Sequence, residues 1–147
     1  MNGSIFTLGA VGALAAMGAL SKRGTQNVHG QIPDEVVESY SYGKCVWLAI
    51  ALYEAYGWPI YVEMDRLPDG EAYVSHAHNK HPSGLEIDIL GPQTEVDSFG
   101  GGRIEGPLDP AGLAKIGGFR VDREKVNEAA HIMRRYVDPA LRAKGLI

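Results

Sequence analysis

Three of the five histidines lie within six residues, in the stretch H-A-H-N-K-H that contains His76, His78 and His81. Imidazole nitrogens bind transition metals, and they also move protons near neutral pH. The chain contains a single cysteine, Cys45, so it cannot form an intramolecular disulfide, and this thiol is a candidate nucleophile. The sequence therefore offers two chemistries, a metal site built from histidines or a cysteine served by one of them.

The metal hypothesis rests on the spacing H-x-H-x-x-H. Alternate residues of a strand point to one side of a sheet, so His76 and His78 can share a metal, with His81 as the third ligand. The spacing resembles the H-x-H-x-D-H motif of metallo-β-lactamases. Lys80 stands where that motif has its aspartate and brings a positive charge to the site. The three-histidine metal site is therefore kept as an alternative.

The cysteine hypothesis begins with the apolar run Cys45–Tyr56, in which Glu54 is the only charged residue. Such a run predicts a helix buried on nearly all sides, and Gly57 is a natural residue to end it. Cys45 then lies in the first turn, beside Lys44, where the positive end of the helix favours a thiolate. A histidine must serve the sulfur as base and acid, and a third group must orient that histidine.

The candidate partners lie on a predicted hairpin. Strands are predicted over 59–66, 71–78 and 85–90, with turns at 67–70 and 82–84. A three-residue loop at 82–84 with its glycine in the left-handed position places Asp88 opposite His78 and diagonal to His76. These positions are about 5 Å and about 7 to 8 Å apart, on the same face of the sheet. Asp88 can therefore orient either histidine.

The remaining predictions concern secondary structure rather than chemistry. A short helix is expected over 33–40, and a closing amphipathic helix over 122–145 is expected to bend at Pro139. Its apolar stripe includes Val126, Ala130, Met133 and Val137, whereas His131 is structural or faces solvent. The glycine- and proline-rich stretch from Gly91 to Gly118 is expected to be mostly loop.

The order of these features resembles that of papain-like cysteine peptidases. More closely, C-V-W-L-A-I-A-L-Y-E-A-Y-G-W-P-I and H-A-H-N-K-H-P-S-G-L-E-I-D-I-L-G are similar to small papain-like proteins of bacteria and their tailed phages. The resemblance covers Tyr42 to Gly91, and in its pattern the histidine precedes the aspartate by twelve residues. It implies Cys45 as nucleophile, His76 as base and Asp88 as the orienting group, with His78 as an alternative base and no cofactor.

The resemblance also implies a fold and a reaction. The implied fold is α+β and papain-like, with a buried helix that carries Cys45 on an antiparallel β meander. To this the residue patterns add a C-terminal helix and an extra apolar N-terminal helix. The reaction is hydrolysis of an amide, isopeptide or thioester bond in a protein or peptide substrate. For the oxyanion hole, Ser39 and Ser41 are weak candidates, and the backbone N–H of Cys45 is another.

The N-terminal residues form a separate segment. Residues 1–23 are rich in glycine and alanine and carry no charged side chain before Lys22 and Arg23. Their length suits a secretory signal, a membrane anchor or a helix that packs in an oligomer or particle. The polar residues 24–33 predict a linker, so the papain-like domain is expected over 34–147.

Composition limits the remaining classes. A chain of 147 residues with 45% hydrophobic residues predicts one globular domain besides the apolar segment. The net charge of −4 argues against a nucleic-acid binder with a broad basic face. The alternatives to the hydrolase are a non-catalytic structural or virion-assembly protein with a papain-like fold and a histidine-cluster metalloenzyme. The apolar segment favours a virion or membrane-associated protein over a freely soluble cytoplasmic one.

Overall fold

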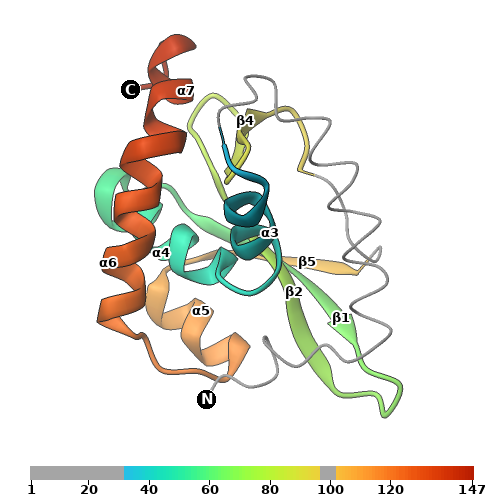
Figure 1. The fold of residues 1–147 in the computed structure, drawn as a ribbon. Coiled ribbons are helices and arrows are strands. Elements are labelled where there is room, and N and C mark those ends of the chain that lie inside the picture. Colours follow the sequence, from blue (N-terminus) through green and yellow to red (C-terminus); the bar gives the residue numbers. More distant parts are fainter. Residues whose placement is uncertain (1–31, 97–101) are drawn as a thin grey trace.

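The computed structural model describes residues 32–96 and 102–147, and these residues form an α+β fold with one antiparallel sheet of five strands (Figure 1). The strand order is β4-β3-β2-β1-β5. The prediction of helices packed on an antiparallel sheet is therefore confirmed. In chain order, the elements are α3 (Asp34–Tyr42), α4 (Cys45–Tyr56), β1 (Ile60–Arg66), β2 (Ala72–Lys80), β3 (Glu86–Asp88), β4 (Gly91–Gln93), β5 (Arg103–Leu108), α5 (Pro110–Gly117), α6 (Arg123–Ile132), η1 (Met133–Val137) and α7 (Asp138–Ala143).

The central helix is α4, which lies between α6 and the sheet (Figure 1). Every residue from Cys45 to Leu52 is buried, as expected for a helix that is apolar on all sides. The helix ends at Gly57, whose φ of 76° is left-handed and whose N–H donates to the carbonyl of Tyr53. The predicted bounds of this helix are confirmed, and Cys45 is its first residue.

A β-bulge in the β1–β2 hairpin lies directly beside His76. Glu63 pairs with His76 and Met64 pairs with Val74, so Ser75 is the extra residue of β2. The Ser75 hydroxyl donates to the carbonyl of Glu63 at 3.0 Å and holds the bulge closed. Bulges of this kind change the side of the sheet to which neighbouring residues point. The bulge therefore helps to set the direction of the His76 side chain.

The β2–β3 hairpin has the predicted loop and register. The N–H of His81 donates to the carbonyl of Leu85, and the N–H of Gly84 donates back to His81. Gly84 has a φ of 93°, in the left-handed region where glycine is favoured. Beyond the loop, Asn79 pairs with Ile87, which is the register expected from a three-residue loop. The strand β3 is shorter than predicted, with only three residues.

The prediction that the segment from Gly91 to Gly118 is mostly loop is wrong. Within its described part, β4 pairs with β3, β5 pairs with β1, and α5 begins at Pro110. The carboxylate of Asp109 accepts the N–H of Gly112 at 2.7 Å and caps α5. The two strands are formed by pairing with their neighbours in the sheet, which the local preferences of glycine and proline do not reveal.

The closing helix predicted over 122–145 is divided into α6, η1 and α7, and the division lies before Pro139, where a bend was predicted. It begins with Asp122, whose side chain accepts the N–H groups of Glu124 and Lys125. The π-helical turn η1 then separates α6 from α7, whose second residue is Pro139. Proline cannot donate a backbone hydrogen bond, and a π turn accommodates such a break. The buried face of the whole closing helix contains Val126, Ala129, Met133, Val137 and Leu141, so Ala129 takes the place predicted for Ala130.

Residues 1–31 lie outside the described part of the chain. The predictions of an apolar helix over 1–23 and of a linker over 24–33 therefore fall almost entirely on residues of which nothing structural is said. Among residues 32–96 and 102–147, no helix is both long enough and apolar enough to cross a membrane.

Candidate active site

Cys45 is the first residue of α4, and its side chain is buried. Lys44 is the N-cap residue, and no side chain among residues 32–96 and 102–147 caps this end of the helix. The first N–H groups of a helix have no partners within it, and together they form its positive end. The sulfur therefore lies beside uncapped N–H groups, an arrangement that stabilises negative charge on sulfur or on a nearby oxygen.

His76 is held through both ring nitrogens. Its Nε2 lies 3.0 Å from Oδ2 of Asp88, and its Nδ1 lies 3.1 Å from the carbonyl oxygen of Ser41. A carbonyl can only accept, and an ionised carboxylate can only accept, so both ring nitrogens must carry a proton to satisfy both contacts. The geometry therefore favours the doubly protonated, positively charged ring.

The pKa of His76 agrees with this geometry. Burial lowers the pKa of the ring, but hydrogen bonds to Asp88 and Cys45, together with their charges, outweigh burial and raise the pKa from 6.5 to about 9. Because Nε2 faces Asp88, Nδ1 is the nitrogen that can serve the sulfur. The site thus brings a thiol, an imidazolium and a carboxylate into one buried chain of interactions.

Asp88 is fixed by donors on its other oxygen. The carboxylate Oδ1 accepts the N–H of Leu90 at 2.9 Å and the side-chain amide of Gln93 at 2.7 Å. Hydrogen bonds from N–H groups favour the ionised form of a carboxylate. Oδ2 is consequently the oxygen that faces His76. Sequence reasoning identified Asp88 but not Gln93, because the strand that carries Gln93 was predicted as loop.

His78, the predicted alternative base, faces a different carboxylate. Its Nε2 lies 3.6 Å from Oε2 of Glu86, and its ring stacks on Tyr61 with 6.1 Å between centroids. Burial and the positive charge of His76 lower the pKa of His78 to about 4. His78 is therefore neutral at physiological pH and lies on the same side of β2 as His76, but it is not the histidine bound to Asp88.

His81 does not join the other two histidines. Its Nδ1 accepts the backbone N–H of Ser83 at 2.9 Å, and its Nε2 donates to the carbonyl of Leu146 at 3.1 Å. Each of the three histidines thus has its own separate partner. Within residues 32–96 and 102–147, no group of three or more His, Cys, Asp or Glu side chains is arranged to hold a metal ion. His131, on α6, is exposed.

The predicted oxyanion-hole serines contribute carbonyl groups to the structure. The carbonyl of Ser39 accepts the N–H groups of Gly43 and Lys44, and the carbonyl of Ser41 faces His76. These contacts close the end of α3 and hold the histidine ring. The N–H groups at the uncapped start of α4 remain the better donors for an oxyanion, as their geometry requires no side chain.

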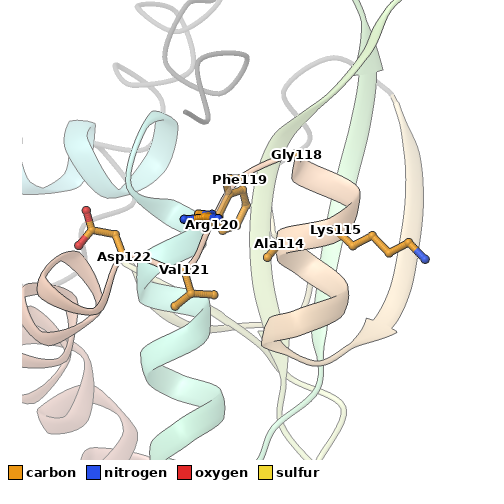
Figure 2. A pocket seen from close by; sticks show the side chains of 7 residues that line it. All are labelled: Ala114, Lys115, Gly118, Phe119, Arg120, Val121 and Asp122. Carbon is orange, nitrogen blue, oxygen red and sulfur yellow. The ribbon is translucent and has the colours of Figure 1, made fainter.

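The candidate site is closed in this structure, since Cys45, His76 and Asp88 are each 2% exposed. A hollow of about 710 Å³ lies elsewhere, between the end of α5 and the loop Gly118–Asp122 (Figure 2). A smaller cavity of about 290 Å³ lies beside the start of β5. Neither of them includes a residue of the candidate site. In the part of the chain that the structure describes, the packing around the sulfur must therefore open before a substrate can reach it.

Comparisons with protein-family models, with curated proteins and with solved structures found no match to this chain. Its function must be argued from the site itself.

Proposed function

We propose that this protein is a cysteine hydrolase in which Cys45 is the nucleophile, His76 its acid and base, and Asp88 the group that orients His76. The observation that carries the proposal is the placement of the His76 ring between the Asp88 carboxylate and Cys45. A nucleophile, a base within reach and a third group that orients the base form the general pattern of covalent hydrolases. The described fold is compatible with a papain-like arrangement, since a helix that begins with the cysteine packs on an antiparallel sheet.

The proposed reaction needs no group beyond these residues and water. The thiolate of Cys45 attacks the carbonyl carbon of an amide, isopeptide or thioester, and the carbonyl oxygen takes up the negative charge near the start of α4. The imidazolium of His76 gives its Nδ1 proton to the leaving nitrogen or sulfur, and a thioester to Cys45 remains. His76 then takes a proton from water, which attacks this thioester and releases the acid and the thiolate.

The Ser41 carbonyl gives the proposed site a particular character. Loss of the Nδ1 proton would leave two lone pairs facing each other across 3.1 Å, one on nitrogen and one on the carbonyl oxygen. The contact therefore favours the protonated ring, so in the proposed reaction His76 acts first as an acid and only later as a base. A substrate that opens the site must also provide its own acceptor for the Nδ1 proton.

The burial of Cys45 favours a second candidate function, a non-catalytic structural or virion-assembly protein that keeps the same fold. In that case the polar chain through His76 would serve stability alone. The two candidates differ in one measurable property, since only a hydrolase requires a reactive thiolate at neutral pH. Metal chemistry through the three histidines is less well supported, because their side chains have separate partners.

Alkylation with iodoacetamide tests the proposal, because Cys45 is the only cysteine and the modified protein reports one site. We expect labelling well below about pH 8, where an ordinary thiol reacts slowly, and a marked loss of the reaction near neutral pH in His76→Gln. The matched control is His131→Gln, which changes an exposed histidine on α6 and should label like the unchanged protein.

The dependence of the labelling rate on pH shows whether slow labelling is due to a closed site or to a thiol that is not ionised. Limited opening lowers the labelling rate by a similar factor at every pH, whereas an ordinary thiol gains about tenfold per pH unit below its pKa. Labelling that begins only above about pH 8, in a protein shown to be folded, contradicts the hydrolase. A large native oligomer whose assembly survives Cys45→Ala would then support the structural candidate.

A further inference from the structure

Gln93 is a polar residue beside the candidate site that takes no part in the steps of the proposed reaction. It is the last residue of β4, and it pairs with Glu86 across the sheet while Gly91 pairs with Asp88. From this position its Nε2 reaches Oδ1 of Asp88 at 2.7 Å, whereas its contact with the carbonyl of Gly91 is longer, at 3.4 Å. The stronger contact is therefore the one that leads toward the candidate site.

The two oxygens of Asp88 have different environments. Oδ1 accepts from Gln93 and from the backbone of Leu90, and Oδ2 faces His76. A carboxylate held at one oxygen by two N–H donors cannot rotate without breaking both bonds. Any residue except proline supplies the backbone donor at position 90, so the side chain of Gln93 is the contact that depends on residue type.

We propose that Gln93 is a positioning residue, and this inference rests on the proposed function. Gln93 fixes the carboxylate of Asp88 so that Oδ2 holds His76 toward Cys45. The order of contacts is Gln93 amide, Asp88 carboxylate, His76 ring and Cys45 sulfur, and it runs from β4 through β3 and β2 to the start of α4. Gln93 acts through Asp88 and touches neither the sulfur nor the bond to be cleaved.

The charged neighbours of this chain are few and identifiable. His78 and Glu86 form the second histidine–carboxylate pair on the same side of the hairpin, and Lys80 lies at the end of β2. Glu86 also lies opposite Gln93 in the sheet. A neutral replacement of Gln93 adds no charge beside Glu86, so it is the replacement whose effect on His76 reports the contact with Asp88.

Two replacements of Gln93 separate positioning from packing. Gln93→Leu keeps most of the volume and removes the donor. Gln93→Glu keeps the shape but puts a second carboxylate beside Asp88 at neutral pH, and it regains an O–H donor when the introduced carboxyl is protonated. A role in packing alone predicts that Gln93→Leu, which keeps most of the volume, leaves the His76 titration unchanged.

The experiment follows His76 by NMR of histidine labelled with nitrogen-15 and follows Cys45 by iodoacetamide alkylation. In Gln93→Leu we expect the His76 titration to move and the alkylation rate at neutral pH to fall about tenfold, the usual scale for losing a hydrogen bond to a charged group. In Gln93→Glu we expect a similar loss at neutral pH and recovery, relative to the unchanged protein, in acid. Gly57→Ala, at the far end of α4, serves as the control for lost stability.

The outcomes distinguish the inference from the proposed function. If Asp88→Asn alters both measurements and Gln93→Leu alters neither, Gln93 does not position Asp88 and the inference is overturned. If alkylation shows an ordinary thiol in every variant, the proposed function fails, and with it the catalytic purpose of Gln93. The His76 titration then still shows whether the contact between Gln93 and Asp88 influences the ring.

Discussion

The buried pair of His76 and Asp88 should make the stability of this protein depend on pH in a defined direction. The pKa of His76 is raised from 6.5 to about 9, so the folded chain binds this proton more tightly than the unfolded chain does. The stabilisation is fully present below about pH 6.5 and is lost as the pH rises through about 9. At 1.36 kcal/mol per unit, its size is about 3 kcal/mol.

Urea unfolding followed by tryptophan fluorescence at several pH values measures this effect. The unchanged protein should lose up to about 3 kcal/mol of unfolding free energy between about pH 6.5 and 9. Asp88→Asn removes the negative charge that favours the protonated ring and should make the profile much flatter. His131→Gln, the exposed control, should keep the slope of the unchanged protein.

Tyrosine ionisation sets the upper end of the pH range in which the loss of stability is due to His76. Burial and a hydrogen bond to Asp138 raise the pKa of Tyr56 to about 12, so its ionisation in the unfolded chain also lowers stability above about pH 10. Measurements up to about pH 9 avoid this contribution. A flat profile in Cys45→Ala, in which thiolate formation cannot offset the loss, or an equal slope in Asp88→Asn, would refute the argument that Asp88 holds His76 protonated.

Two further substitutions test the structure away from the candidate site. Tyr56→Phe removes a 2.7 Å hydrogen bond to the buried carboxylate of Asp138. This substitution should lower the unfolding free energy by about 2 kcal/mol, and a loss below about 0.5 kcal/mol would show that the bond is not important. Gly57→Ala adds a Cβ at a φ of 76°, and beyond the adjoining residues no atom of the described part of the chain lies within 4 Å of it. Backbone strain alone should therefore cost about 1 to 2 kcal/mol in the same measurement, and no loss would contradict the left-handed assignment.

Sequence reasoning succeeded where a local rule was strong. The run from Cys45 to Tyr56 is so uniformly apolar that only a buried helix can accommodate it, and Gly57 marks its end. The short loop before Leu85 fixes the register of its hairpin because each turn type permits few pairings. That register brought Asp88 within reach of His76, although it could not choose between the two histidines.

Apart from the twelve-residue spacing of the resemblance, the choice between His76 and His78 depends on features that sequence does not display. The bulge at Ser75, the carbonyl of Ser41 and the position of α4 decide which ring lies near the sulfur. The strand that carries Gln93 has only three residues, one of them proline, and it exists because β3 offers it a partner. For α5 a usable signal was present, since Asp109, Pro110 and Gly118 are a helix cap, a first-turn residue and a C-terminal stop.

The π turn before Pro139 has a consequence for the whole C-terminal region. The buried positions from Ala129 onward recur every four residues, up to Leu141. In an ordinary α-helix each such step rotates the side chain by about 40°, so three steps would turn the last one by about 120° from the first. The wider turn of η1 removes most of this drift and keeps the two helices in phase. Deletion of one residue there would rotate Leu141 toward solvent and withdraw Asp138 from Tyr56, so this helix tolerates substitution far better than a change in length.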